Sequence, residues 1–513
     1  MRRATVLLAA AIGMGATCGT YSWHNFSNTQ QVAPEYMAEP KSLDDLVRAV
    51  RLAGENSRRI RMVGSGHSHS NVAVNEDVLL TPTGLTKPLT LVRSRLKDPN
   101  AFGLVRVQSG ITLRALNQYL DTQNLALQNM GGYDAQTIVG AAMTGTHGSG
   151  LGYGPIASQI VSMQVVGEGG TVYQVEPTNG ITNPVGFPGT QEENGSIPVT
   201  LIQNDDIFNA MTVSIGSMGI VYSVVLKTDR KFWLDERRTL MKWSEVNRPG
   251  GILDRLMQGL PIDDSAHPAE HVELQYNPYA VDGDRSVLLT TRTRYYDRPT
   301  NGDNVRGQPL TGALEGLVVG TSFVIAAIVN TFPATVPGLI ETALKQQVDS
   351  NGYVSDSYNV FNIGKVNETK AIAVEIGFDL ADARDVIERA FQIADDLRTR
   401  RLMHSAPGAI RFVRSTDAMI SMAQGRPTVV LEVIVLQDVN GHEDLLRYYE
   451  QTMMEEFGGR LHWGLDLDVI QGEAWPRAVY PRWDDWLAVF RQFNHGTFDG
   501  KVTDRLGISV RPR

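Results

Sequence analysis

The order of apolar and polar positions predicts an amphipathic helix over residues 42–54. Its apolar side chains follow the helical spacing i, i+3, i+4 and i+7: Leu43, Leu46, Val47 and Val50. Ser42 precedes them as an N-cap, Asp45 stands three residues later as the partner in a capping box, and Gly54 ends the pattern. We therefore expect a surface helix with one buried face.

Short runs of aliphatic and β-branched residues predict strands along the rest of the chain. In the first half these runs are residues 59–63, 78–80, 104–107, 160–166 and 171–175. The last two are expected to form a hairpin across the turn at 167–170, and Thr112 is expected to cap a second helix. Further on, residues 272–276 and 429–435 predict strands and residues 381–399 predict a helix. This mixture of elements predicts an α+β protein.

Composition limits the partners and the chemistry. The 513 residues exceed what one hydrophobic core holds, so two or three domains are expected. A net charge of −9, with no basic block interleaved with aromatic residues, argues against a nucleic-acid partner. Cys18 is the single cysteine, which excludes a disulfide framework and any CxxC metal or redox site.

The first residues have the pattern of a targeting segment. Arg2 and Arg3 precede an apolar, small-residue stretch at 4–16, which is shorter than the about 20 residues that a membrane-spanning helix needs. The paired arginines hint at twin-arginine export, whereas the residues before Cys18 match a lipoprotein signal poorly. We expect residues 1–20 to be a signal or anchor segment, and the protein to be exported or membrane-associated.

A glycine-serine loop at residues 64–70 follows the predicted strand 59–63. Gly64 and Gly66 allow a tight turn that brings backbone N–H groups close to an anion. Ser65 and Ser68 add hydroxyl donors suited to phosphate oxygens. His67 presents an imidazole to whatever the phosphates belong to. Such combinations also occur in ordinary turns, so the loop alone does not identify a ligand.

A second stretch, residues 131–150, is rich in glycine, small residues and hydroxyl groups. Such a segment suits a place where the backbone approaches a large flat ligand and donates hydrogen bonds along it. A floppy linker is the alternative, but Thr144, Thr146 and the β-branched residues at 138–139 argue against it. Residues 216–221 form another segment of close approach that leads into a strand.

Two classes of chemistry remain open on these motifs. Two glycine-serine loops that each carry a histidine suggest a dinucleotide-like cofactor, and the absence of GxGxxG at the first strand disfavours a nicotinamide dehydrogenase. The rival is a metal hydrolase that uses His67, His69 and His147. No carboxylate stands beside these histidines at metal-ligand spacing, and a metal site leaves the abundance of glycine unexplained, so no metal is expected.

An apolar segment in the second half does not fit either class. Residues 316–340 contain no charged side chain. The segment could dip into a membrane or line an apolar substrate entrance. A packed helix broken by Pro333 and Pro337 is the favoured interpretation.

Several of these motifs together resemble the vanillyl-alcohol oxidase superfamily, within it the sugar-lactone and alditol oxidases. Residues 63–70, 131–150 and 216–221 resemble its flavin-binding domain, and residues 23–27 resemble its W-x-N-W-S opening. Residues 273–279 resemble its E-x-x-x-x-P-Y strand. The later landmarks are residues 409–411, 462–464 and 480–483.

The resemblance implies a fold with defined boundaries. A two-lobed PCMH-type FAD-binding domain would span residues 21–228. A cap domain, with an antiparallel sheet flanked by helices, would span residues 229–470 and supply the substrate face. Residues 471–513 would return to the FAD domain.

The resemblance also implies roles for individual residues. His67 matches the histidine that such enzymes join covalently to the flavin, and Arg411 matches a substrate-side arginine. Ile220 matches a contact to the adenine side. The pyrophosphate contacts would be Gly64, Ser65, Gly66 and Ser68. The second flavin-contacting stretch would comprise Thr137, Gly140, Thr144, Gly145, Thr146 and His147.

Two departures from the family pattern concern the substrate. Ala409 replaces a common glutamate and Leu465 a common lysine, so both changes remove a charge from the expected sugar site. Glu432, in an apolar run, is the leading candidate for the catalytic base, with Glu375 and His462 as runners-up.

We expect an FAD-dependent oxidase that acts on a CH–OH group of a sugar lactone, a polyol or a related alcohol. O₂ is the expected acceptor. The alternatives are a dehydrogenase that uses another acceptor and an enzyme for a less polar alcohol such as a sterol.

Overall fold

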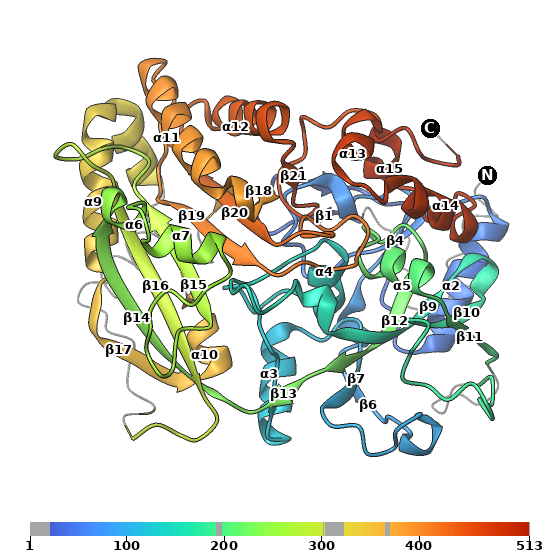
Figure 1. The fold of residues 1–513 in the computed structure, drawn as a ribbon. Helices are drawn as coiled ribbons and strands as arrows, with labels where there is room; N and C mark the ends of the chain where they lie inside the picture. The colour runs from blue at the N-terminus through green and yellow to red at the C-terminus, as the bar shows by residue number, and fades with distance from the viewer. Residues whose placement is uncertain (1–20, 191–196, 301, 303–322, 365–369, 512–513) are drawn as a thin grey trace.

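Two lobes lie side by side in the computed structural model, which describes residues 21–190, 197–300, 302, 323–364 and 370–511 (Figure 1). The expected targeting segment at 1–20 and the first part of the apolar run, 316–322, lie outside the described residues. The first lobe contains the N-terminal strands and helices, and the second contains a large antiparallel sheet with helices on it. The predicted α+β class is confirmed.

A small parallel sheet opens the first lobe. Its strands are β3 (Tyr36–Ala38), β5 (Val78–Leu80) and β4 (Ile60–Met62), in that order. The predicted helix is α2 (Leu43–Glu55), and Ser42 caps it by accepting a hydrogen bond from the N–H of Asp45. The Asp45 carboxylate accepts from the N–H of Lys41 instead of Ser42, so the predicted capping box is only half formed. The apolar face of α2 packs into the core that this sheet shares with its larger neighbour.

The larger sheet of the first lobe has six strands. In order they are β11 (Val199–Gln203), β10 (Val172–Glu176), β9 (Ile160–Val166), β12 (Ile220–Lys227), β7 (Leu104–Gln108) and β6 (Pro88–Leu89). The predicted β9–β10 hairpin is confirmed, with Val166 paired to Val172. Thr112 caps α3 (Leu113–Thr122) as predicted. The glycine-rich stretch contains a helix that was not predicted, α4 (Ile138–Met143), because six residues without a polar side chain are too few to show a helical period.

The cap sheet has eight strands, and every neighbouring pair is antiparallel. In order they are β17 (Asp349–Asp356), β14 (Trp233–Lys242), β16 (Ser286–Tyr295), β15 (His271–Tyr276), β19 (Gly408–Val413), β20 (Thr428–Leu436), β18 (Ala371–Asp379) and β21 (Arg460–Leu461). Helices α11 (Ala383–Thr399) and α12 (His442–Phe457) cover one face and bury its apolar side chains (Figure 1). The other face is turned toward the first lobe.

The apolar segment is a bent pair of helices at the far end of the cap. Helix Phe323–Thr331 is followed by the 3₁₀ turn η6 (Pro333–Thr335) and by α9 (Val336–Gln346). Pro337 does not break a helix, because it lies in the first turn of α9, where no N–H donor is needed. Among the described residues no single helix is long and apolar enough to cross a membrane, whereas this pair, bent by 105°, passes that test jointly.

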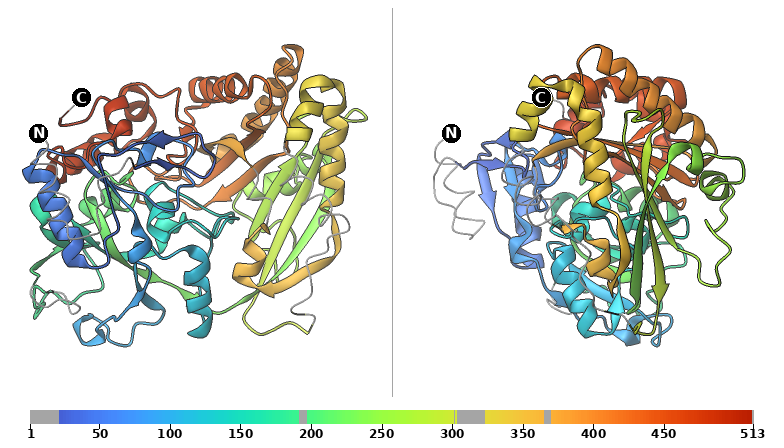
Figure 2. Two further views of the ribbon diagram at one scale, coloured as in Figure 1. Left: turned by 180° about the vertical axis from the view of Figure 1, so that it is seen from behind. Right: turned by 90° about the vertical axis from the view of Figure 1, so that its left-hand side faces the viewer.

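The C-terminal residues return to the first lobe, beside the N-terminal strands (Figures 1 and 2). They form α13 (Ala474–Val479), α14 (Trp483–Phe493) and α15 (Lys501–Arg505). The N–H of Ile60 on β4 donates to the carbonyl of Thr497, and Arg59 forms a bidentate ion pair with Asp504 at 2.7 and 2.8 Å. Strand β4, which leads into the glycine-serine loop, is therefore held by the last segment of the chain.

The remaining elements are short connections. They are β1 (Trp23–His24), β2 (Gln31–Val32), η1 (Asn71–Ala73), η2 (Pro82–Gly84), η3 (Arg93–Arg95), β8 (Leu125–Ala126), η4 (Ile156–Gln159), η5 (Glu168–Gly170), α5 (Asp205–Thr212), β13 (Asp229–Arg230), α6 (Trp243–Val246), α7 (Ile252–Met257), α10 (Ser357–Phe361) and η8 (Leu380–Asp382).

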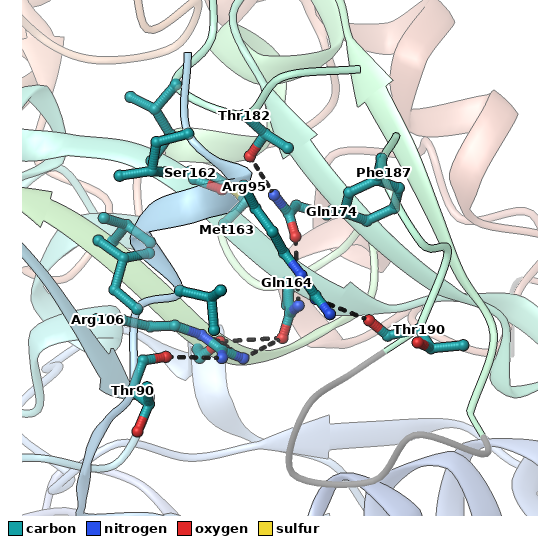
Figure 3. A pocket seen from close by; sticks show the side chains of 16 residues that line it. Thr90, Arg95, Arg106, Ser162, Met163, Gln164, Gln174, Thr182, Phe187 and Thr190 are labelled. Atoms are coloured by element: carbon teal, nitrogen blue, oxygen red, sulfur yellow. Dashed lines mark hydrogen bonds between the residues drawn. The ribbon is translucent and has the colours of Figure 1, made fainter. Parts of the chain in front are cut away.

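A polar cavity of about 530 Å³ lies on the six-stranded sheet (Figure 3). The buried guanidinium of Arg106 on β7 donates to Gln164 Oε1 on β9 at 2.7 Å and to Ser223 Oγ on β12 at 3.3 Å. These bonds join three adjacent strands. The cavity shares no lining residue with the cleft beside the glycine-serine loop at 64–70.

One buried carboxyl makes the stability of the fold depend on pH. Glu450 on α12 is buried, and within the described chain its Oε1 has no hydrogen-bond partner. Burial, together with the charges of Asp466 and Asp468, raises its pKa to about 9 from the ordinary 4.5. The side chain is thus protonated in the folded state at neutral pH and ionised in the unfolded state.

We expect Glu450→Gln to stabilise the protein as the pH rises. Wild type should lose stability between about pH 4.5 and pH 9, because unfolding releases the proton of Glu450 in that window. The variant should be more stable by about 2–3 kcal/mol at about pH 7, with a smaller difference near pH 5. Denaturant unfolding at both pH values measures this. Glu443→Gln, an exposed position on the same helix, is the control. A pH-independent difference would contradict the assignment.

Candidate functional site

A cleft of about 1030 Å³ lies in the first lobe where it meets the loop after β21. Nine of the twelve predicted cofactor-contacting residues line it: Gly64, Ser65, Gly66, His67, Ser68, Thr137, Gly140, Thr144 and Ile220. Its volume suits a large ligand. Three loops far apart in the sequence therefore meet around one cavity.

The wall of this cleft is backbone, which fits the close approach of a dinucleotide. A Cβ added at Gly64 or at Gly140 would lie 2.8 or 2.7 Å from Thr137 Oγ1, which real Cβ atoms do not tolerate. Gly66 has a φ of +76°, which favours glycine. Since these positions exclude a side chain, the backbone can approach a ligand in the cleft closely, as FAD binding requires.

His67 stands between two aromatic rings at one end of the cleft. Its ring centroid lies 4.8 Å from that of Phe26 and 4.4 Å from that of Tyr133. Burial, with a smaller contribution from His69, lowers the pKa of His67 to about 4. The imidazole is therefore neutral at physiological pH and offers an unprotonated nitrogen, the form in which a histidine acts as a nucleophile.

The histidines of the rival metal site have separate surroundings. His69 Nδ1 accepts a hydrogen bond from the N–H of Ala373 at 3.2 Å, and burial lowers its pKa to about 4. His147 faces Glu375, and His67 lies between the rings of Phe26 and Tyr133. Across the described residues, no group of three or more His, Cys, Asp or Glu side chains could hold a metal ion.

A charged network occupies the cap face that meets the first lobe. Arg411 Nη1 lies 2.8 Å from Glu375 Oε1 and 2.5 Å from Glu432 Oε2, and its Nη2 lies 3.4 Å from Glu273 Oε1. The four side chains come from four strands, β19, β18, β20 and β15, and share one face by register. Burial alone would lower the pKa of Arg411, but the three carboxylates raise it, so the guanidinium stays charged.

The carboxylates of this network differ in proton affinity. Burial would raise the pKa of Glu375, but His147, His462 and Arg411 hold it well below its ordinary value. Burial raises the pKa of Glu432, and the charge of Glu375 adds to this effect against the opposing charge of Arg411. Glu432 therefore takes up a proton more readily than Glu375 does.

Two further histidines connect the network to the cleft. His147 Nδ1 donates to the carbonyl of Gly148 at 2.8 Å, so its Nε2 faces Glu375 Oε2 at 3.5 Å. Its ring lies 6.3 Å from that of His462, which lines the cleft. His462 Nδ1 accepts from the N–H of Gly464 at 3.0 Å, so the neutral ring carries its proton on Nε2 and acts as a donor.

Three predicted cofactor residues do not line the cleft: Gly145, Thr146 and His147. Thr146 Oγ1 is nevertheless buried and, within the described residues, has no hydrogen-bond partner, which leaves it available to a ligand. Sequence reasoning assigned no role to Glu273, although it lies in a predicted strand. Its neighbours His271 and Gln275 are polar, so a lone carboxylate in an apolar run, the signal that pointed to Glu432, is absent here.

Comparison with protein families and known proteins agrees with this geometry. Residues 34–176 match the FAD binding domain family, and residues 262–506 match the D-arabinono-1,4-lactone oxidase family. The chain is 29% identical to L-gulono-1,4-lactone dehydrogenase of Mycobacterium tuberculosis, over 91% of this chain and 94% of that protein. It is 22% identical to mouse L-gulonolactone oxidase, over 86% and 88%.

The fold is also that of a known crystal structure. Cholesterol oxidase from Brevibacterium sterolicum superposes with a TM-score of 0.73 over 96% of this chain and 97% of its own, at 16% identity. At that identity the similarity concerns the fold alone. The predicted two-lobed FAD-binding fold with its antiparallel cap sheet is thereby confirmed. The match to the FAD binding domain family confirms FAD as the cofactor.

We expect Arg411→Met to destabilise the protein in a pH-dependent way. Removal of the cation leaves three buried carboxylates without their partner, at a loss of about 3–5 kcal/mol near pH 8. The loss should shrink toward pH 5, since the carboxyl groups of the variant take up protons when folded. Denaturant unfolding at both pH values measures it. Arg447→Met, at an exposed ion pair, should change little. An equal loss at both pH values would count against the network.

Proposed function

We propose that the protein oxidises a CH–OH group of a sugar lactone or related alcohol at the cap face around Arg411. The chain belongs to the sugar-lactone oxidase branch of the FAD-dependent vanillyl-alcohol oxidase superfamily. The observation that carries this proposal is the charged network, which is linked to the cleft through His147 and His462. FAD, when bound, supplies the acceptor for the hydride of the substrate carbon.

Arg411 and Glu432 divide the remaining work in this proposal. Arg411 stays charged, so it stabilises negative charge that develops on the substrate oxygen. Glu432 accepts the hydroxyl proton, since its raised pKa makes it a stronger base than Glu375, whose pKa is lowered. His462 is disfavoured because its Nδ1 already accepts a hydrogen bond from the N–H of Gly464.

The register of the cap sheet supports Glu432 as a replacement for the missing family glutamate. Glu432 pairs directly with Ala409, the position where relatives commonly carry that carboxylate. Its side chain therefore lies on the same face as Arg411 and next to the methyl group of Ala409. A carboxylate is kept beside the arginine, but it is presented from the neighbouring strand.

The substrate is proposed to be less hydrophilic than a polyol. Leu465 lines the cleft where relatives often carry a lysine, and Ala409 adds no charge. Both changes favour a modified lactone or a less polar alcohol. The relatives include both an oxidase and a dehydrogenase by name, and we propose O₂ as the acceptor.

Glu432→Gln should slow the reduction of bound FAD by a sugar-lactone substrate about 10²-fold or more, because the hydroxyl proton loses its acceptor. FAD content should not change. Anaerobic stopped-flow mixing with L-gulono-, D-arabinono- and alkylated lactones measures the rate, and peroxide formed in air tests the acceptor. Glu375→Gln is the matched control and should slow the reaction less. A Glu432→Gln enzyme as fast as wild type would remove Glu432 as the base, and a protein without flavin would overturn the proposed function.

We propose that the protein works at a membrane outside the cytoplasm. The N-terminal pattern at 1–20 supports export. A second support is the bent helix pair, on which Phe323 is 61% exposed, Phe332 60% and Leu339 43%. No charged residue occurs between 316 and 340, and the first one after this run, Glu341, is buried against Ser286. Large apolar side chains without charges suit the interfacial layer of a bilayer.

The double variant Phe323→Ser/Phe332→Ser should bind phospholipid vesicles at least about tenfold more weakly than wild type, since each buried phenyl ring contributes about 1.5–3 kcal/mol. Co-sedimentation of the full chain with vesicles measures binding. Phe102→Ser, an equally exposed phenylalanine on the first lobe, is the control. Equal binding by both variants and wild type would show that these rings do not contact lipid.

A further inference from the structure

The loop that carries His67 is held from outside by the N-terminal hairpin. The N–H of Phe26 donates to the carbonyl of Gly66 at 2.7 Å, and Asn25 Nδ2 donates to the carbonyl of Ser68 at 2.9 Å. Gln30 Nε2 donates to the carbonyl of His69 at 3.0 Å. Three carbonyls of the loop therefore point toward the hairpin. Because the N–H of a peptide plane points away from its carbonyl, the N–H of His67 faces the other way.

Asn25 is the centre of this contact. Asn25 is 1% exposed, and both polar atoms of its side-chain amide form hydrogen bonds. Nδ2 also donates to Thr29 Oγ1 at 2.7 Å, and Oδ1 accepts from the N–H of Gln30 at 2.9 Å. The amide thus shapes the hairpin turn and ties it to the loop at the same time. Among the described residues, no side chain of the turn at 25–30 belongs to a buried apolar cluster, so the position of the turn depends on polar bonds.

The rings of Phe26 and Tyr133 fix the imidazole itself. Phe26 contacts it with an interplanar angle of 40°, and Tyr133 contacts it edge-on at 65°. Tyr133 belongs to the glycine-rich stretch and Phe26 to the hairpin, so the imidazole is bounded by two separate segments. A ring held on two sides has few rotamers open to it.

The hairpin is in turn attached to the cap. Gln437 Nε2, just after β20, donates to the carbonyl of Ser27 at 2.7 Å. On the opposite side of the loop, the N–H of His69 donates to the carbonyl of Gly464 at 2.8 Å. The His67 loop is therefore clamped between the hairpin and the cap, and neither contact involves a residue of the charged network.

We propose that the hairpin turn at 25–30 aims the His67 imidazole at bound flavin, which makes Asn25 and Phe26 positioning residues for covalent attachment of FAD. The inference rests on the proposed function. In the attachment a nitrogen of His67 bonds to the carbon of the flavin 8α-methyl group. One methyl hydrogen and the imidazole N–H hydrogen leave as protons. The flavin ring retains two electrons from the broken bonds. These two electrons reduce O₂, the proposed acceptor, which takes up the two protons to give H₂O₂.

The test separates attachment from binding. Asn25→Ala and Phe26→Ala should keep FAD bound, while the fraction of flavin that stays with acid-precipitated protein should fall about tenfold or more, because bond formation is sensitive to misplacement of about 1 Å. Phe26→Trp restores a ring and should restore the fraction. Phe102→Ala, an exposed phenylalanine far from the hairpin, should match wild type. Circular dichroism verifies that each variant is folded.

The other outcomes are distinguishable. Acid-stable flavin at the wild-type level in both alanine variants would overturn this inference and leave the proposed function intact. Complete loss of FAD from both variants would overturn it too, since the hairpin would then serve binding rather than aim. Wild type whose flavin is wholly released by acid would overturn covalent attachment and this inference, but not the oxidation of a CH–OH group. Wild type without flavin would overturn the proposed function itself.

Discussion

Three carboxylates buried around one guanidinium set the electrostatics of the cap. Arg411 carries one positive charge, and Glu273, Glu375 and Glu432 would carry three negative charges if all were ionised. A buried excess of that size is tolerated only where protons or further cations compensate it. The raised pKa of Glu432, whose first cause is burial, favours the uptake of such a proton, and Glu375 Oε2 has His147 Nε2 at 3.5 Å. The ability to hold a proton is thus a consequence of how the sheet is charged.

The two lobes solve different parts of the problem with different chemistry. In the first lobe the absence of side chains at Gly64 and Gly140 brings backbone to the cleft. In the cap, charged side chains on neighbouring strands form the face at which we propose that the substrate binds. The contact of His147 with Glu375 joins the two lobes, and the ring of His462, 6.3 Å from that of His147, lines the cleft.

Much of the fold and part of the site could be predicted from local pattern. The helix after Ser42, the β9–β10 hairpin and the glycine-serine loop all depend on residues close in sequence. The pairing of Glu432 with Ala409, the place of Glu273 and the grip of Asn25 on Ser68 join segments that are far apart in the chain. Register between distant strands is decided by the whole sheet, and no local period encodes it. The short helix α4 was missed for a different reason, because its six residues include no polar side chain and so show no amphipathic period.

The proposed replacement of the family glutamate at position 409 on β19 by Glu432 on β20 changes the direction from which a carboxylate reaches Arg411. Directly paired residues of an antiparallel sheet have Cβ atoms about 4.5–5.5 Å apart. A carboxylate moved to the partner position therefore reaches the same guanidinium from the other side, while the space over Ala409 is left to a methyl group. With Leu465 at the cleft, the site keeps one arginine and its proton-holding partner but has fewer polar contacts for additional hydroxyl groups. The proposed tolerance of a less polar substrate rests on these two substitutions, Ala409 and Leu465.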